Sequence, residues 1–293
     1  MTTIFPHSYR MILCGILVLF FLAPVNAYAQ DEVVEDSTAW KKNLVASLAG
    51  SQASYDNWAE GGINSLAFAA SLNGDANRTT QNWIQKHEMR LALGSLKQDS
   101  TDFRKADDLI QFLLTFQYQN DDTFAKWHPT GAFELRTQFA NGFDYSGAEA
   151  VKVSALFSPA TLQQTFGFTY QPEDWFTWLI GLAAKETVVG IEELRPNYGN
   201  DLDETVRFEA GLSSKASVDR DIFENVNLKT SLGVFTAFDQ FDKPDIRWDN
   251  LITMSVNSWL TVNFEFVTFY DLDISDKVQL KQVLSTGISI GLL

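Results

Sequence analysis

Hydrophobic and polar residues alternate along the last segment of the chain. Apolar residues take most even-numbered positions there, namely Leu280, Leu284, Ile288, Ile290 and Leu292. Polar residues and glycines take most of the odd-numbered positions. A period of two residues is that of a β-strand with one apolar and one polar face. Similar stripes recur earlier in the chain, as in Phe176, Trp178, Ile180 and Leu182. The pattern therefore predicts an all-β protein.

The alternation predicts twelve strands. Their expected ranges are 40–55, 63–73, 82–94, 109–119, 130–141, 151–171, 175–188, 205–217, 224–238, 246–257, 260–271 and 277–292. The range 151–171 contains Ser158-Pro159, and proline cannot donate a hydrogen bond to a strand ladder. A turn at this point would make the strand count odd, whereas single-chain bacterial barrels have an even count with both termini in the periplasm. We therefore predict one long, kinked strand there, and expect the longest connection, 190–203, to be an external loop.

Twelve successive strands predict a closed antiparallel up-and-down transmembrane β-barrel, with fourteen strands as the alternative. Trp83, Trp175, Trp259 and Tyr270 lie near predicted strand ends, where outer-membrane barrels carry interfacial aromatic girdles. A soluble protein is the alternative class, because soluble β-sandwiches also alternate. We expect residues 40–293 to form a single barrel domain.

The first 29 residues have the features of a cleaved signal peptide. Arg10 precedes an apolar stretch, and Ala27-Tyr28-Ala29 is a small-x-small cleavage box. The only cysteine, Cys14, lies inside the apolar stretch, so the exported chain has none for a disulfide. Residues 30–39 form a short acidic periplasmic linker. We expect an outer-membrane protein of a Gram-negative envelope, in contact with outer-membrane lipid and lipopolysaccharide. Periplasmic chaperones and the barrel-insertion machinery would be its assembly partners.

The chain is acidic, with a formal net charge of −15, which makes duplex nucleic acid a poor candidate partner. The polar face of the predicted strands nevertheless carries more bases than acids. The bases are Lys86, Arg90, Arg136, Lys152, Lys185, Arg207, Lys215, Lys229, Arg247 and Lys281. The acids are Glu88, Glu134, Glu209, Asp249 and Glu265. Most other acids, including Asp107, Asp108, Asp271 and Asp273, are assigned to connections. The lumen wall is thus predicted to be net basic.

Two readings of these lumen charges remain open. Pairs such as Glu88 and Arg90 share one face, where cross-strand partners can form ion-pair ladders. The surplus bases can also favour a small anionic solute. A twelve-stranded barrel lies between those filled by side chains and those with a wide channel. We therefore predict a narrow, porin-like channel or small-solute binding protein. The alternatives are a structural or lipid-binding envelope protein with a closed lumen, and an outer-membrane lipid hydrolase.

The sequence offers little catalytic chemistry. Beyond the signal peptide the histidines are His87, expected on the lipid side, and His128, at a strand entrance. Neither lies in a recognisable hydrolase motif, and no phosphate loop or paired-histidine metal signature is present. We expect no enzymatic activity beyond a residual chance of a phospholipase, and no cofactor or metal.

One segment, Asn57-Trp58-Ala59-Glu60-Gly61-Gly62-Ile63-Asn64-Ser65, resembles the opening signature of an uncharacterised bacterial family, the domain of unknown function numbered 3078. Three further landmarks are Thr137-Gln138-Phe139, Phe157-Ser158-Pro159-Ala160 and Phe269-Tyr270-Asp271-x-Asp273. The resemblance would span residues 40–292 and implies secreted, envelope-associated barrels without an assigned activity. Physically, Gly61-Gly62 allows a tight reversal of the chain that Asn57 can cap. Trp58 would either anchor this loop at the interface or fold into the mouth and gate a solute. Asn64 completes this motif.

Overall fold

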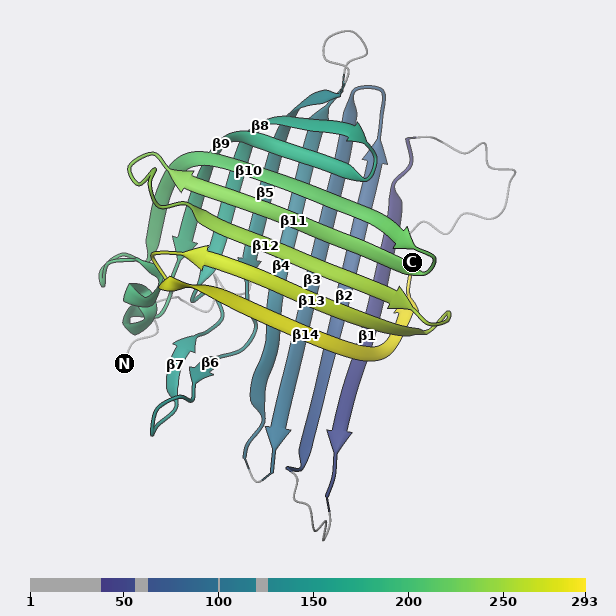
Figure 1. Ribbon diagram of the computed structural model, residues 1–293. Helices are drawn as coiled ribbons and strands as arrows, with labels where there is room; N and C mark the ends of the chain where they lie inside the picture. The colour runs from purple at the N-terminus through teal and green to yellow at the C-terminus, as the bar shows by residue number, and fades with distance from the viewer. Residues whose placement is uncertain (1–37, 56–62, 100, 120–125) are drawn as a thin grey trace, which may run out of the picture. The chain divides into compact units, whose positions relative to one another are not determined.

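A computed structural model describes residues 38–55, 63–99, 101–119 and 126–293. The predicted signal peptide, residues 30–37 of the predicted linker, and Asn57, Trp58, Gly61 and Gly62 of the motif lie outside the described residues. Residues 38–293 form a closed β-barrel, in which the strands of one wall run across those of the other (Figure 1). This crossing follows from the tilt that strands need in order to close a barrel.

Twelve antiparallel strands make up the barrel wall. They are β1 (Lys41–Ala53), β2 (Ser65–Thr79), β3 (Trp83–Gln98), β4 (Arg104–Tyr118), β5 (Trp127–Thr137), β8 (Ala160–Glu173), β9 (Phe176–Val188), β10 (Val206–Phe223), β11 (Val226–Ala237), β12 (Asp245–Ser255), β13 (Leu260–Asp271) and β14 (Ser275–Gly291). Each strand pairs with its neighbours along the chain, and β1 closes the barrel against β14. The predicted twelve-stranded up-and-down barrel is confirmed.

The predicted long strand at 151–171 is wrong. Its first part is β7 (Val151–Ser154), which pairs only with β6 (Gly142–Asp144) in a separate small sheet. The chain then turns at Ser158-Pro159, and β8 begins at Ala160. The even strand count survives because the extra hairpin stays outside the barrel. This excursion, 138–159, also exceeds the 190–203 loop that was expected to be the longest connection.

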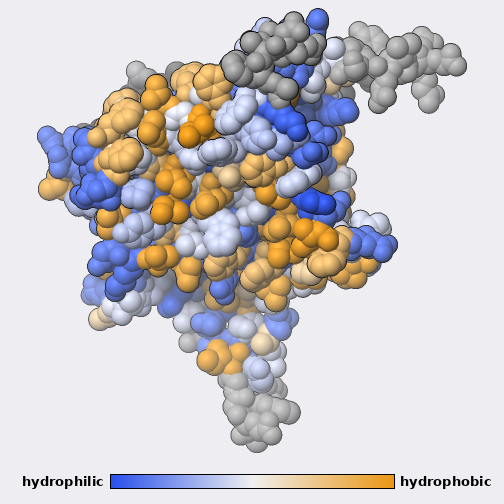
Figure 2. All heavy atoms as spheres, turned by 45° about the horizontal axis from the view of Figure 1, so that its top comes forward, coloured by the Kyte–Doolittle hydropathy of each residue, from blue (hydrophilic) through white to orange (hydrophobic). Residues whose placement is uncertain are grey.

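Apolar side chains cover the outside of the barrel. The apolar stripe of β14 faces outward, and its Leu284 is 71% exposed. On β8, Phe166 is 70% exposed. In Figure 2 hydrophobic residues cover much of the barrel wall, and hydrophilic residues gather toward the margins of the view. Water would make so large an apolar surface costly, whereas lipid tails would cover it favourably.

The two ends of the barrel differ. The pairing of Val45 with Gly291 places both chain termini of the wall at one end, together with the short turns at 174–175 and 224–225. The long connections 138–159 and 189–205 lie at the other end. Exposed tryptophans lie at or just before strand starts at the end with the termini, namely Trp83, Trp127, Trp175 and Trp259. This ring matches an interfacial aromatic girdle. We call the two ends the turn end and the loop end.

Two glycines allow the backbones of β8 and β9 to approach each other closely. Gly167 and Gly181 lie opposite each other, and a Cβ on Gly181 would collide with the carbonyl oxygen of Phe166. We expect Gly181→Ala to lower the free energy of unfolding by about 1–3 kcal/mol, because backbone atoms cannot yield as a side chain can. Urea titration followed by gel mobility measures this. Gly131→Ala on β5 is the control, since its Cβ would meet the Phe166 ring at an ordinary 3.5 Å.

Candidate functional site in the barrel lumen

Charged residues from distant strands meet at mid-depth of the lumen. The Arg90 Nη2 of β3 lies 2.7 Å from the Glu265 Oε2 of β13. Lys281 Nζ of β14 lies 2.7 Å from the Asp107 Oδ1 of β4, and 3.3 Å from Glu265 Oε1. We call Arg90, Glu265, Lys281 and Asp107 the cross-lumen clamp. It joins β3 and β4 to β13 and β14, which are four strands away around the wall.

A second group of charges, on β5, β10 and β12, lies at a similar depth. Lys215 Nζ lies 2.8 Å from Glu134 Oε2, and the Gln111 side-chain amide donates a 2.8 Å hydrogen bond to the other oxygen of Glu134. Arg247 and Asp249 pair within β12 at 2.9 Å. The side chains of Arg247 and Asp249 are each 27% exposed, so solvent reaches them inside the barrel. The middle of the lumen is therefore polar and partly hydrated.

A third group lies toward the loop end. Lys185 pairs with Glu209 at 2.9 Å and with Asp245 at 2.5 Å. Arg207 pairs with Glu209 at 2.9 Å and with Asp273 at 2.6 Å. These four contacts link β9, β10, β12 and the turn after β13, so they brace the barrel mouth.

The structure brings together most of the predicted lumen charges. Arg207 with Glu209 and Arg247 with Asp249 pair within their strands, while Arg90 and Glu134 take partners from distant strands. Lys229 pairs with Asp219 at 3.0 Å near the turn end. Lys86 forms none of the described ion pairs. Its ammonium donates a 3.4 Å hydrogen bond to the side-chain oxygen of Gln171. Glu88 and Arg136 lie on the same inward face of β3 and β5 without a described ion pair.

The predicted excess of lumen bases is not retained. Lys152 lies on β7, outside the barrel, and is exposed. Four acids that the sequence interpretation had not placed on the wall pair with lumen bases: Asp107, Asp219, Asp245 and Asp273. With these changes the predicted lumen bases no longer outnumber the acids, and Asp75 of β2, opposite Glu88, adds a further acid to the inward face. The described lumen wall has no surplus of bases, so its charge gives no basis for a preference for anions.

Neutral polar side chains line the lumen at the turn end. The hydroxyl of Ser289 lies 2.8 Å from those of both Ser47 and Thr261, which joins β1, β14 and β13. Beside them is an open recess of about 510 Å³, also lined by Asn225, Ser255 and Asn257. Hydroxyl and amide groups can bind small polar molecules by hydrogen bonds without selecting a charge.

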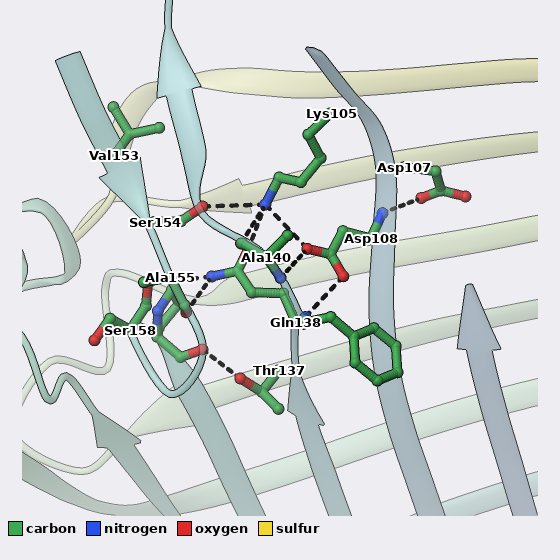
Figure 3. A network of polar contacts seen from close by, with 12 residues as sticks. Lys105, Asp107, Asp108, Thr137, Gln138, Ala140, Val153, Ser154, Ala155 and Ser158 are labelled. Carbon is green, nitrogen blue, oxygen red and sulfur yellow. Dashed lines mark hydrogen bonds and ion pairs between the residues drawn. The ribbon is translucent and has the colours of Figure 1, made fainter. Parts of the chain in front are cut away.

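A buried network fastens the 138–159 excursion to the loop end of the barrel (Figure 3). The carboxylate of Asp108, with a side chain only 1% exposed, accepts 2.8 Å hydrogen bonds from the backbone N–H groups of Phe139 and Ala140. Lys105 Nζ lies 3.3 Å from the same carboxylate and also donates to Gln138, Ala140 and Ser154. We call Lys105, Asp108 and Gln138 the rim anchor. Asp108 had been assigned to a solvated connection, so its buried role corrects that interpretation.

Tyr198 fastens the same excursion from the other side. It ends the short 3₁₀ helix η1 (Glu192–Tyr198), and its hydroxyl donates a 2.7 Å hydrogen bond to the carbonyl oxygen of Val153. Burial raises the pKa of Tyr198 to about 12, from an ordinary value of 10.0. The docked tyrosine is stabilised in full below pH 10, and this contribution is lost as the pH rises through 12.

We therefore expect cleavage of the 138–159 excursion by proteinase K to accelerate between pH 10 and 12. Tyr198→Phe lacks both the hydrogen bond and the titrating group, so its cleavage should be faster at neutral pH and show no added rise in this range. Cleavage of an unstructured peptide at each pH corrects for the activity of the protease. Equal pH profiles for the two proteins would contradict this role of Tyr198.

Ile63, Asn64 and Ser65 are the described residues of the family-like motif, and Asn64 makes side-chain contacts. Its side-chain oxygen accepts a 2.6 Å hydrogen bond from the Tyr55 N–H, and its own N–H donates to Asp99 at 3.1 Å. Asn64 thus ties the end of β1 to the end of β3. The capping role expected of Asn57 lies outside the described residues and stays a prediction.

The described residues offer few groups for other chemistry. His87 faces outward from β3, with its ring 5.0 Å from Trp40 and 5.5 Å from Phe116. His128 lies on β5, opposite Thr169 of β8. Within the described ranges no cluster of three His, Cys, Asp or Glu side chains is placed to hold a metal ion. No helix in the described part of the chain is both long enough and apolar enough to cross a membrane.

An apolar outer surface around a charged, hydrogen-bonded interior defines the class of transmembrane β-barrels. A family model described as "Protein of unknown function (DUF3078)" matches residues 51–143 of the chain. This confirms the resemblance over the range that holds the Asn57–Ser65 motif and Thr137-Gln138-Phe139. Its extension over the later landmarks stays a prediction. No curated protein matches the chain.

Several solved barrels follow a distantly similar course. The translocator domain of the autotransporter NalP from Neisseria meningitidis is 10% identical, with a TM-score of 0.38 over 97% of this chain and 96% of that one. An outer membrane channel from Pseudomonas putida F1 is 8% identical, with a TM-score of 0.38 over 89% of this chain and 99% of that one. The β domain of the Bordetella autotransporter BrkA is 9% identical, with a TM-score of 0.32 over 85% of this chain and 98% of that one. So distant a likeness says nothing about activity.

Proposed function

We propose that the protein is an outer-membrane β-barrel that offers a narrow passage to small polar solutes, and that the cross-lumen clamp sets its width. The location is supported by the apolar outer surface and by the ring of exposed tryptophans at the turn end. The passage is supported by the polar lumen, whose mid-depth side chains of Arg247, Asp249 and Lys215 remain about one quarter exposed.

The clamp is the observation that carries the proposal. Arg90 and Lys281 reach across the lumen to Glu265 and Asp107, so these side chains occupy part of the cross-section. Because the described wall has no surplus of bases, we propose selection by size and hydrogen bonding rather than by sign of charge. The anionic solute expected from the sequence becomes one outcome of the test.

Planar-bilayer recording on the purified protein tests this proposal. We expect a small conductance with weak ion selectivity, and a larger one for the double variant Arg90→Gln/Glu265→Gln, whose neutral amides no longer attract across the lumen. The control is Lys229→Gln/Asp219→Asn, which removes an ion pair whose side chains are 60% and 55% exposed. Its conductance should equal that of the unchanged protein. A reversal potential that shows clear anion selectivity in a salt gradient would favour the anionic solute expected from the sequence.

A barrel with a closed lumen is the second candidate function, and the same clamp favours it. Four charged residues bridging strands on either side of β1 and β2 can serve as an internal brace in a structural envelope protein. This candidate predicts no conductance above that of protein-free membranes, in either the unchanged protein or the double variant. That result would overturn the proposed passage.

A further inference from the structure

The seam that closes the barrel is short. β1 and β14 pair from Val45 opposite Gly291 to Ala49 opposite Gly287, which is five residue pairs. Every other pair of neighbouring barrel strands shares at least eight. Continuing the register would place Ser51 opposite Ser285 and Ala53 opposite Val283, but these residues do not pair. The described backbone therefore leaves the seam open toward the loop end.

The unpaired part lies at the depth of the apolar outer surface. On its other edge, the stretch 283–286 of β14 pairs with 262–265 of β13, in the middle of the wall. Leu284 of β14 and Leu48 of β1 point outward beside the opening, and are 71% and 60% exposed. Lipid cannot satisfy the free N–H and C=O groups of a strand edge. Water in the lumen can satisfy these groups, so an unpaired edge at this depth is tolerated where it borders a hydrated lumen. An opening bordered in this way would connect the lumen with the bilayer.

The lumen wall beside the opening differs from the rest. Ala49 of β1 lies opposite Ala69 of β2, and Val283 lies on the inward face of β14, opposite Glu265. Farther in, this tract reaches the cross-lumen clamp, whose Lys281 is two residues from Val283. Ser51 and Ser285 lie on the same inward face at the border of the opening. A molecule entering sideways would thus meet these two hydroxyls and small apolar side chains first, and paired charges next. That order suits an amphiphile.

The clamp also holds the opening from within. Its ion pairs join β3 and β4 on one side of the seam to β13 and β14 on the other, and so they span β1 and β2. With so few backbone pairs at the seam, these side-chain contacts carry much of the connection between the two edges. Their separation would widen the gap.

We propose that the stretches 50–53 of β1 and 283–286 of β14 border a lateral portal, through which an amphiphile with an acyl chain passes between the bilayer and the lumen. The portal rests on the proposed passage, because it opens into the same lumen. The acyl chain would lie along Ala49, Ala69 and Val283, and the polar end would face the clamp. An added polypeptide strand fits less well, because it could not pair along both edges of the opening. Residues 275–286 of β14 are free, but only four residues of β1 are, fewer than half of the ~9–11 residues with which a strand spans a membrane.

Lipid quenching tests whether acyl chains enter. A fluorophore is attached at position 69 through Ala69→Cys, and in a matched protein at position 231 through Ser231→Cys, both in a Cys14→Ser background. Both positions face the lumen, but Ser231 lies on β11, opposite Asp249 and away from the seam. In liposomes of phosphatidylcholine with brominated acyl chains, we expect loss of fluorescence at position 69 and little loss at position 231. Heat-modifiable gel mobility confirms that each labelled barrel is folded.

Disulfide cross-linking tests the seam itself. The pair Ser47→Cys/Ser289→Cys should oxidise readily, because the two hydroxyls lie 2.8 Å apart in the paired part. The pair Ser51→Cys/Ser285→Cys, two residues farther along, should oxidise far more slowly. Equal rates would show a fully paired seam and overturn the proposal, as would equal quenching at positions 69 and 231. Cross-links between two chains through position 51 or 285 would overturn it in favour of pairing with a second copy. Conductance is measured separately, so the portal can fail while the passage stands.

Discussion

Replacing Glu265 by alanine is expected to destabilise the barrel strongly. Its carboxylate is 10% exposed and receives both Arg90 and Lys281. The substitution leaves the guanidinium of Arg90 without its partner. Breaking a fully buried pair from one side costs about 3–5 kcal/mol, and solvent around the Arg90 side chain, which is 26% exposed, lowers this cost. Lys281 keeps Asp107, which limits the loss on that side. The measurement is the urea midpoint at which the unheated protein loses its folded gel mobility.

A second variant separates the lost ion pair from simple loss of packing. Arg90→Met/Glu265→Met removes both charges and keeps comparable side-chain volume, so it should recover most of the stability that Glu265→Ala loses. Asp219→Ala serves as the exposed control, because its partner Lys229 stays in water. If Glu265→Ala lowered the urea midpoint no more than Asp219→Ala does, the cross-lumen clamp would not contribute to the stability of the barrel.

Asp108→Ala is expected to release the 138–159 excursion from the barrel. The substitution removes the acceptor for the N–H groups of Phe139 and Ala140, and the carboxylate that neutralises Lys105. Each buried donor left unsatisfied costs about 1–3 kcal/mol, and more for the charged one. The loss is local, because β6 and β7 pair only with each other and the twelve-stranded wall remains closed without them.

Limited proteolysis with mass analysis of the fragments measures this release. In the variant, cuts should appear within 138–159 while the barrel strands stay protected. The cleavage rate of Asp108→Asn should lie between those of the unchanged protein and Asp108→Ala, because its single side-chain oxygen accepts fewer hydrogen bonds than a carboxylate. Asp102→Ala is the matched control, an exposed acid in the connection just before β4. An unchanged cleavage pattern in Asp108→Ala would show that the rim anchor does not hold the 138–159 excursion against the barrel.

Alternation along the chain was enough to predict the barrel and the face on which most charges lie. Each strand has a period of two, so parity alone sent Lys86, Arg90 and Glu265 inward. It was not enough to tell which partner a strand takes. The segment 151–154 alternates like a barrel strand but pairs with β6, because a short hairpin can satisfy its own backbone away from the wall.

The partners of the lumen charges could not be read from the sequence. Arg90 and Glu265 are 175 positions apart and meet only because closure brings β3 and β13 to face each other. Asp107 was missed for a different reason. β4 begins at Arg104, five residues before the predicted start at 109, and a register shift beside Gly94 and Ser95 accompanies this extension. Charged residues at a strand entrance look like a loop in sequence, although here they turn into the lumen.

The tryptophans at the turn end have a consequence for how the barrel sits. Trp83, Trp127, Trp175 and Trp259 lie at or just before strand starts at that end, and indole rings favour the boundary between headgroups and tails. These rings are therefore expected to set the height of the turn end in the bilayer. The loop end carries exposed phenylalanines instead, among them Phe103, Phe139, Phe238 and Phe241, so the two ends differ in the kind of aromatic side chain that they expose.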